Sequence, residues 1–465
     1  MKTHHKIYVG DGRKCLTKIE HKSVNTCTTS PPYWGLRDYK TDPLIWDGDS
    51  DCEHEWGEEQ VTKGQYGMNK DFNKRWNNYN GNKKKQEECK PKSLNQGSFC
   101  QKCGAWKGSL GLEPTFDLYI KHLCDIFDEV KSVLRDDGTC WVNLGDTYSN
   151  SGGMSNPAPD RAGGKAVGTR GTQPSAIAKG GFERPKNDVQ SKCLLQIPSR
   201  FSIEMTNRGW ILRNTIIWHK NNCMPSSASD RFTVDFEYLF FFSKSEKYYF
   251  EQQFEEYTKP LDRWGGDSLK ANGKSTWDNG TGQSSYRDRN MRPNELGRNK
   301  RTVWNINTKP FPGSHFAVFP EELIETPIKA GCPEFICDKC GKPREKIYED
   351  TGELIQQEGH GSKTADHINA SPTSSLRTKK VKEKKSVGYT NCKCNAGFHP
   401  GTVLDPFAGS GTTGKEAKNQ GKNSILIELN PDYIPMIIKR LDLESQDTWK
   451  KHGIELDHTY EIIRD

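Results

Sequence analysis

Apolar residues in this chain fall into short continuous runs and helical stripes, separated by long polar segments. The runs, which are typical of buried strands, cover residues 7–9, 139–144, 210–218, 236–242, 403–404 and 424–427, and residues 23–28 form a further strand in which apolar and polar residues mix. Apolar residues at helical spacing cover residues 114–134, 194–207, 323–328 and 430–441. A further helix is expected to begin at Thr412, and the polar stretch 135–138 is expected to form a turn. Strands that alternate with helices in this way predict an α/β fold with a parallel, doubly wound sheet.

Four polar segments interrupt this pattern. Residues 47–110 are rich in Lys, Asn and Gly, residues 246–305 mix arginines with aromatics, and residues 332–400 are strongly charged. Residues 150–190 are rich in Gly, Ser and basic side chains, and such a composition buries too little apolar area to order itself. We expect a flexible loop there, which either closes over phosphates or stays solvated.

The bulk composition narrows the class of protein. The 465 residues include 68 basic and 61 acidic ones, and the net charge of +7 is compatible with nucleic acid as a partner without requiring it. The richest apolar run, 238–242, is far shorter than the roughly 20 residues that cross a bilayer, and the N-terminus has no apolar signal segment. We therefore expect a soluble, cytoplasmic protein without a membrane partner. Its 15 cysteines favour metal sites or free thiols over disulfides.

Residues of the kind that ligate zinc fall into two groups inside the polar segments. The first group is Cys52, His54, Cys100 and Cys103, and the second is Cys337, Cys340, Cys392 and Cys394. In each group a Cys-x2-Cys-Gly knuckle brings two thiolates onto one cation, and a second close pair completes a tetrahedral set. Segments this polar have little core of their own, so a structural zinc ion would supply their fold. The alternative for both groups is a scatter of reduced cysteines.

Residues 29–34 read Thr-Ser-Pro-Pro-Tyr-Trp and directly follow a predicted strand. Pro31 and Pro32 stiffen the backbone and leave carbonyls free as acceptors, while Tyr33 and Trp34 add flat faces beside them. Rigid acceptors next to aromatic planes suit a nucleobase that carries an exocyclic amine. The same residues also suit a proline turn with two core aromatics, and local chemistry does not choose between the two.

Residues 402–414 read TVLDPFAGSGTTG, a strand end followed by a tight glycine turn and the start of a helix. Glu428 ends the next strand, 19 residues after Gly409, where a carboxylate accepts both hydroxyls of a ribose. Adenosyl cofactors and dinucleotides share that ribose. Because 409–414 also spells GxGxxG, a nicotinamide-dependent oxidoreductase is a second hypothesis, although only about 50 residues follow the motif. A nucleotide triphosphatase would need Ser or Thr at position 416, which is Glu416.

Together the two segments resemble the beta-type amino-methylating DNA methyltransferases, which move a methyl group from S-adenosylmethionine to a base nitrogen. Ser30-Pro31-Pro32-Tyr33 matches the family's catalytic tetrapeptide, and 405–411 matches its cofactor loop. The resemblance implies a Rossmann-like S-adenosylmethionine-dependent methyltransferase fold with circularly permuted motif order and inserted zinc-knuckle and DNA-recognition segments. The divisions expected are the start of the catalytic half (1–46), a zinc-knuckle insertion (47–110), the rest of the catalytic half (111–245), a target-recognition region (246–305), a cofactor-lining segment (306–331), a zinc-ribbon insertion (332–400) and the cofactor-binding half (401–465).

The resemblance also implies roles for single residues. It assigns Ser30, Pro31, Pro32 and Tyr33 to catalysis. Candidates for the base pocket are Trp34, Asp146, Trp218 and Lys220. Candidates for cofactor binding are Asp11, Phe316, Asp405, Pro406, Phe407, Ala408, Gly409, Ser410, Gly411, Thr412 and Glu428. Asp11 fits a simple turn after a strand almost as well.

The implied reaction begins when one base is flipped out of duplex DNA. Tyr33 stacks on the base, and the Pro31 carbonyl and Ser30 hydroxyl hold its amine for direct in-line transfer, with no covalent enzyme intermediate and no catalytic metal. Ser at the first tetrapeptide position accompanies cytosine-N4 products more often than adenine-N6 products, so we expect cytosine and keep adenine as the alternative.

A third hypothesis, a zinc-dependent DNA-binding protein without catalysis, has no use for Asp405, Glu428 and the tetrapeptide together. The partner we expect is double-stranded DNA in a prokaryotic or phage setting. A second copy of the chain and a cognate restriction endonuclease are partners that the sequence leaves open.

Overall fold

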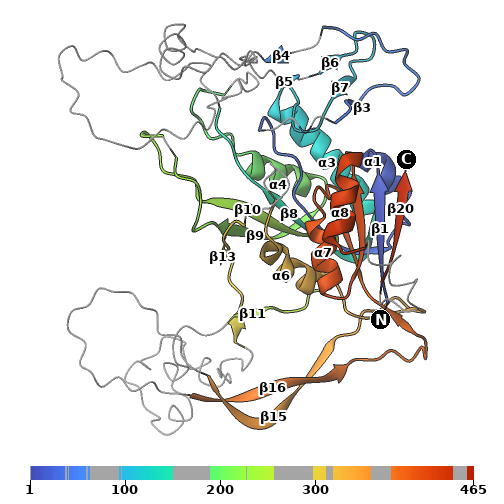
Figure 1. Ribbon diagram of the computed structural model, residues 1–465, viewed down its shortest axis with the longest axis vertical. Coiled ribbons are helices and arrows are strands. Elements are labelled where there is room, and N and C mark those ends of the chain that lie inside the picture. Colours follow the sequence, from blue (N-terminus) through green and yellow to red (C-terminus); the bar gives the residue numbers. More distant parts are fainter. Residues whose placement is uncertain are drawn as a thin grey trace, which may run out of the picture.

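The computed structural model describes residues 2–36, 39, 41–58, 61–62, 94–95, 97–149, 189–226, 228–255, 297–309, 318–357, 379–443 and 458–464. Its centre is a nine-stranded sheet in the order β13-β9-β10-β8-β2-β18-β19-β1-β20 (Figure 1). The strands are β1 (Thr3–Val9), β2 (Val24–Thr29), β8 (Leu134–Leu144), β9 (Ile211–His219), β10 (Phe236–Ser243), β13 (Val303–Asn305), β18 (Thr402–Asp405), β19 (Asn423–Glu428) and β20 (His458–Arg464). Neighbours are parallel except where β10 pairs with β8 and β9. The predicted parallel sheet is thus confirmed over most of its width.

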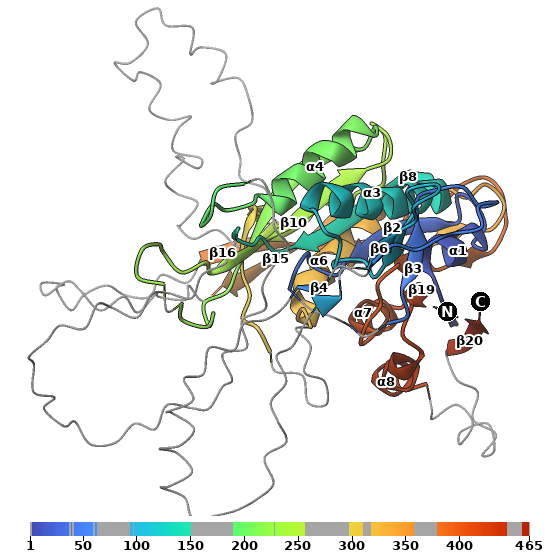
Figure 2. The same ribbon diagram turned by 90° about the horizontal axis from the view of Figure 1, so that it is seen from above.

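Helices cover both faces of this sheet (Figure 2). One face carries α1 (Gly12–Thr17), α3 (Phe116–Val133) and α4 (Ile197–Asn207), and the other carries α6 (Glu321–Gly331), α7 (Thr412–Asn419) and α8 (Ile434–Arg440), the last preceded by a 3-10 turn (Pro431–Tyr433). On the first face Phe127 of α3 and Phe201 of α4 pack with Phe242 of β10. On the second face the rings of Trp141 and Phe241 stack at 3.9 Å beneath α6. With both faces buried, a ligand must bind at the strand ends. None of the helices described is both long and apolar enough to cross a bilayer.

The turn expected at residues 135–138 is wrong, because these residues continue β8. The Lys244 N–H donates to the Gly138 carbonyl, and the Tyr249 N–H donates to the Asp137 carbonyl. Since the segment after β10 satisfies these backbone groups, a locally polar stretch stays extended.

The polar insertions form small sheets of their own. In the first, β6 (Ser98–Phe99) and β7 (Trp106–Gly108) join β3 (Leu44–Trp46), and β4 (Val61–Thr62) pairs with β5 (Leu94–Asn95). In the last, β14 (Ile336–Cys337) pairs with β17 (Phe398–His399), while β15 (Lys346–Gln357) and β16 (Lys379–Tyr389) form a hairpin that projects from the sheet (Figure 1). Between β10 and β13, β11 (Phe254–Glu255) pairs with β12 (Arg298–Asn299).

Two of the sequence predictions fall mostly on residues outside the described part of the chain. These are the flexible loop at 150–190, of which only 189–190 are described, and the core of the recognition region, residues 256–296.

Candidate active site

The tetrapeptide lies at the carboxyl end of β2, in the middle of the sheet and next to β18. The Pro32 carbonyl accepts a hydrogen bond of 2.7 Å from the Tyr119 hydroxyl of α3. The Gly35 N–H donates to the Gly111 carbonyl at 2.8 Å, and a Cβ at Gly111 would come within 3.2 Å of the Tyr33 carbonyl oxygen. This segment is therefore clamped from the α3 side, in the extended geometry that its prolines favour.

Tyr33 is held over the end of β8. Its hydroxyl lies 3.0 Å from Asn143 Oδ1 and 2.8 Å from Glu237 Oε2. Its ring lies so close to Gly145 that a Cβ there would stand 2.7 Å from a ring carbon. Burial raises the pKa of Tyr33 well above its ordinary value, and the neighbouring Glu237 charge adds to the rise. The hydroxyl is therefore a neutral donor at any working pH.

Asn143 and Glu237 complete a polar cluster that the sequence did not predict. Ser30 Oγ donates to Asn143 Oδ1 at 3.3 Å, and Asn143 Nδ2 donates to Glu237 Oε2 at 3.1 Å. The Glu237 carboxylate forms an ion pair with Lys220, and both side chains are less than one-fifth exposed. A signal was present in the sequence, since Asn143 is the one amide in the run 139–144 and Glu237 the one charged residue in the run 236–242, but only pairing of β8 with β10 brings the two together.

The structure separates the four candidates for the base pocket. Lys220 belongs to the polar cluster through its ion pair with Glu237. Trp218 lies directly opposite Glu237 in the ladder of β9 and β10, but it is 3% exposed and its indole N–H donates to the Ile306 carbonyl. Trp218 is thus a buried residue that packs under the polar cluster, with Lys220 Nζ over its ring.

The other two candidates require correction. The Trp34 side chain is 1% exposed, packs edge-on against Phe116 and donates to the Glu113 carbonyl, so it is a core residue with no face for a base. Asp146 Oδ1 accepts from the N–H groups of Thr147 and Ile197, and its carboxylate therefore caps the start of α4. From this strand end, Asn143 is the residue that reaches the tetrapeptide.

The cofactor loop connects β18 to α7 beside the tetrapeptide. Asp405 accepts hydrogen bonds from Thr29 Oγ1 at 2.5 Å, Thr413 Oγ1 at 2.6 Å and the Phe407 N–H at 3.0 Å. Its side chain is 1% exposed, and burial raises its pKa to about 6. The expectation of a direct cofactor contact is therefore corrected for Asp405: its carboxylate holds the loop against β2 and has no free face.

The glycine turn has the predicted shape. Gly409 and Gly411 adopt φ of 52° and 80°, a left-handed conformation that favours glycine, and Gly411 precedes the first residue of α7, Thr412. The Pro406 and Ala408 side chains are buried below the turn, and Phe407 is partly buried. Ser410 Oγ accepts a hydrogen bond of 2.6 Å from Arg440.

Glu428 lies at the end of β19, next to that turn. Its two carboxylate oxygens accept from the N–H groups of Gly409 at 2.7 Å and Asn430 at 2.8 Å. Burial raises its pKa to about 7. Asp11 lies at the end of the adjacent strand β1, where it caps α1 and forms an ion pair of 2.7 Å with Arg13. A turn role is thus confirmed for Asp11, at the strand edge that also carries Glu428.

A cavity of about 290 Å³ adjoins the loop on the side of α7. Lys309, Lys415 and Arg440 line it together with Glu321, which forms ion pairs with Lys415 and Arg440. Apolar surface comes from Val318, Phe319 and Pro320. The last three come from the predicted cofactor-lining segment. Phe316 of the same segment lies outside the residues that the structure describes.

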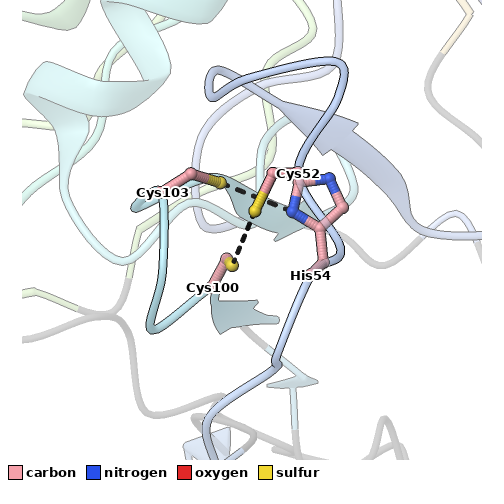
Figure 3. A group of neighbouring side chains, drawn as sticks. All are labelled: Cys52, His54, Cys100 and Cys103. Carbon is pink, nitrogen blue, oxygen red and sulfur yellow. Dashed lines mark hydrogen bonds between the residues drawn. The ribbon is translucent and has the colours of Figure 1, made fainter.

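Both predicted groups of zinc-ligating side chains come together. In the first, Cys52 Sγ lies 4.0 Å from Cys100 Sγ, and Cys103 Sγ lies 3.4 Å from His54 Nδ1 (Figure 3). Around one zinc ion, bond lengths of about 2.3 Å to sulfur place neighbouring sulfurs roughly 3.8 Å apart. The four ligand atoms of each group lie within 4.8 Å of one another. Both donor sets therefore fit a tetrahedral ion.

The two knuckles share one backbone design. The N–H of Gly104 donates to the Cys100 carbonyl, and the N–H of Gly341 donates to the Cys337 carbonyl, with both glycines at positive φ. The N–H groups around each knuckle lower the pKa of its first cysteine against the opposing effect of burial, to about 5 for Cys100 and about 6 for Cys337. Thiolates are the form that a metal binds.

A chain of buried contacts joins the first insertion to the tetrapeptide, starting where Trp46 pairs with Trp106, three residues after Cys103. Trp46, at the end of β3, stacks on His122 of α3 at 4.6 Å. His122 Nδ1 lies 3.1 Å from the Glu113 carboxylate, which also accepts a hydrogen bond from the Gly111 N–H. The backbone carbonyl of Glu113 accepts one from the Trp34 indole N–H. The knuckle insertion is thus fastened to the clamp on the catalytic segment.

Comparison with known proteins identifies the class. The model of a DNA methylase family of N6/N4 methyltransferases matches residues 24–335 and 395–439. The type II methyltransferase M.SmaI of Serratia marcescens is 27% identical over 436 residues, covering 94% of this chain and 90% of the relative. M.Cfr9I of Citrobacter freundii is 28% identical over 443 residues, covering 95% and 88%. A solved structure, the cytosine-N4-specific PvuII DNA methyltransferase, is 13% identical with a TM-score of 0.42, covering 100% of this chain and 97% of that one.

A cofactor loop and a tetrapeptide at adjacent strand ends of a Rossmann-like sheet define an amino-methyltransferase, and the family match contains both segments. The chain belongs to the N6/N4 DNA methylase family. We therefore discard the nicotinamide-dependent oxidoreductase and the non-catalytic zinc protein. The unmatched residues 336–394 contain the second group of zinc-type ligands, so this segment lies outside the family match.

Proposed function

We propose that this protein is a type II DNA methyltransferase that transfers a methyl group from S-adenosylmethionine to the N4 amine of a flipped cytosine, with adenine N6 as the alternative. The single observation that supports it best is the position of Ser30, Tyr33 and Asn143 beside the cofactor loop. The type II relatives add support for duplex DNA as the substrate and for a cognate restriction endonuclease as a companion.

The base would stack on Tyr33, whose ring is fixed by Gly145 below it and by hydrogen bonds at its hydroxyl. The amine of the base is a poor nucleophile because its lone pair is delocalised into the ring. Acceptors at Pro31 and Ser30 draw its hydrogens out of the ring plane, which localises the lone pair toward the donor methyl. Transfer then depends mainly on orientation.

S-adenosylmethionine would supply the electrophilic methyl group. In this proposal Glu428 accepts the ribose hydroxyls, and the backbone N–H groups of the turn at 409–411 meet polar groups of the donor. The cavity beside Arg440 takes the methionine end, with Arg440 shared between Glu321 and the ligand. Ser at position 30 is the reason to favour cytosine, following the family's preference. We place target recognition in 246–305, whose described ends meet as β11 and β12.

The test is incubation of the protein with methyl-labelled donor and varied duplexes, followed by digestion and identification of the modified nucleoside by mass spectrometry. We expect N4-methylcytosine. N6-methyladenine would overturn the base assignment alone, whereas absence of label from every duplex would overturn the function.

We also propose that each metal group binds one structural zinc ion. Metal analysis of the purified protein is then expected to find two zinc ions per chain. Cys103→Ala and Cys340→Ala should each lose one. Because the first group is fastened to the catalytic clamp through Trp46, His122 and Glu113, its loss should lower methyl transfer more than loss of the second. Zinc near zero in the unaltered protein would contradict both sites.

Donor binding is expected to weaken as the pH falls from about 8 to about 6. The pKa of Glu428 is raised to about 7, so the protonated form, which accepts ribose hydroxyls poorly, accumulates below that pH. Affinity should fall by up to about tenfold per pH unit below the pKa. The matched control is Glu428→Gln, which removes the titrating carboxyl. The part of the pH dependence that comes from Glu428 should vanish in this variant, whereas the part that comes from the donor's own groups should be equal in both proteins. Parallel curves for the two proteins would contradict the role of Glu428.

A further inference from the structure

The amide of Asn143 has a fixed orientation inside the polar cluster. Its Nδ2 lies 3.1 Å from Glu237 Oε2 and 3.0 Å from the Tyr238 carbonyl. A carboxylate oxygen and a carbonyl oxygen only accept, so the NH2 group must face them. Asn143 Oδ1 consequently faces Ser30 and Tyr33 as an acceptor, 3.3 Å from Ser30 Oγ.

This orientation decides what the Ser30 hydroxyl can do. A hydroxyl has one proton and two lone pairs. With Asn143 Oδ1 taking that proton, the lone pairs of Ser30 are left for the amine of a base. If the Asn143 amide were reversed, its NH2 would donate to Ser30, and the Ser30 proton would turn toward the amine, so that a donor would face a donor.

We propose that Lys220 and Glu237 set the direction of a hydrogen-bond relay that runs through Asn143 to Ser30 and keeps Ser30 an acceptor for the target amine. The inference rests on the proposed function and deepens it. Glu237 is a positioning residue, since it acts through Asn143 and Tyr33 and does not itself touch the base.

Lys220 gives the relay its fixed end. Its ammonium forms an ion pair with Glu237 Oε1, while Glu237 Oε2 accepts hydrogen bonds from the Tyr33 hydroxyl and from Asn143 Nδ2. The Lys220 side chain is anchored in turn, with its Nζ 4.3 Å from the centre of the Trp218 ring and its backbone N–H donating to the Asp235 carbonyl. An ammonium group has only donors to offer, so the group that meets it must present an oxygen.

Glu237→Gln keeps the shape of the side chain but replaces the acceptor oxygen that faces Asn143 with an NH2 donor. Lys220 would hold the glutamine oxygen, and the glutamine NH2 would face Asn143 Nδ2, donor against donor. Relief requires the Asn143 amide to turn, which places its oxygen against the Tyr238 carbonyl and its NH2 against Ser30. Each arrangement leaves one repulsive contact, and the turned one weakens Ser30 as an acceptor for the target amine.

The experiment compares single-turnover methyl transfer by the full chain and its variants on a duplex that the unaltered protein methylates. For Glu237→Gln we expect a rate roughly 10- to 100-fold lower, with unchanged affinity for S-adenosylmethionine. In the double variant Asn143→Asp with Glu237→Gln, both oxygens of the introduced carboxylate accept, and the glutamine NH2 becomes a suitable donor to it. One of these oxygens still faces the Tyr238 carbonyl. We therefore expect partial recovery, with the double variant faster than Glu237→Gln and slower than the unaltered protein.

A purely structural role for Glu237 would make the double variant slower than either single one. The relay is overturned if Glu237→Gln stays within about twofold of the unaltered protein, or if the second substitution brings no recovery. Lys220→Met offers an independent arm, because freeing Glu237 should slow transfer without altering donor affinity, and an unchanged rate would also contradict the relay. If the unaltered protein transfers no methyl group to DNA, it is the proposed function that fails.

Discussion

Tyr33→Ala is expected to lower kcat/KM for DNA by roughly 5- to 150-fold from lost stacking alone, because a base stacked on an aromatic side chain gains about 1–3 kcal/mol. The substitution also removes the hydroxyl that meets Asn143 and Glu237, so the fall should lie at or above the upper end of this range. Affinity for S-adenosylmethionine should not change, since Glu428 and the glycine turn are untouched. Steady-state kinetics with labelled donor, together with equilibrium binding of the donor, measure the two effects separately.

The matched control is Tyr33→Phe, which retains the ring and deletes only the hydroxyl. It should lose less activity than Tyr33→Ala. Gly145→Ala provides a second check, because its methyl group would stand 2.7 Å from the Tyr33 ring and force the ring to move. Full activity in Tyr33→Ala would show that no base stacks on this side chain.

Asp405→Ala is expected to abolish measurable donor binding and to lower the melting temperature. The carboxylate accepts from Thr29, Thr413 and the Phe407 N–H. Thr413 retains the Thr28 carbonyl, but the Thr29 hydroxyl and the Phe407 N–H would lose their acceptor in a buried site. Each unsatisfied buried donor costs about 1–3 kcal/mol, which is a large share of a typical domain's stability. Calorimetric titration with S-adenosylmethionine and thermal unfolding provide the measurements.

Asp405→Asn tests whether shape or charge matters at this position. The pKa of Asp405 is raised to about 6, so ionising it costs native stability progressively as the pH rises from about 4 to about 6. Asparagine keeps one acceptor and avoids that cost, while Thr413 retains the Thr28 carbonyl as an acceptor for its proton. The asparagine variant should therefore bind the donor nearly normally, and it should gain stability relative to the unaltered protein over that pH range. Normal donor binding by Asp405→Ala would contradict the loop-holding role.

Local sequence signals were sufficient for much of the fold and for two parts of the site. The apolar runs marked seven of the nine strands of the main sheet and missed β13 and β20. The glycine turn and the tetrapeptide were recognisable because their residues are adjacent in sequence. The cysteine pairs were equally local, because each knuckle is closed by its own backbone. Such features depend on neighbours along the chain, which a sequence displays directly.

Residue roles that depend on distant partners were not predictable in the same way. Trp34 was expected to face a base, but α3 takes its ring into the core, and Asp146 was expected in the pocket, but it caps α4 instead. Asn143 and Glu237 escaped notice because they meet only through the pairing of β8 with β10. In each case a contact between segments far apart in sequence determined the direction of the side chain.

The antiparallel strand pairs through which the two cysteine-bearing insertions join the main fold have a practical consequence. Each insertion leaves and rejoins the main fold through short antiparallel pairs, β3 with β7 and β14 with β17, with four zinc-type ligands gathered close by. Closing a loop of greater length adds little entropic cost once its ends are fixed. We therefore expect the residues between the two ligand pairs of each insertion to tolerate changes in length while the sheet stays intact, which makes these positions natural points for grafting foreign modules onto the enzyme.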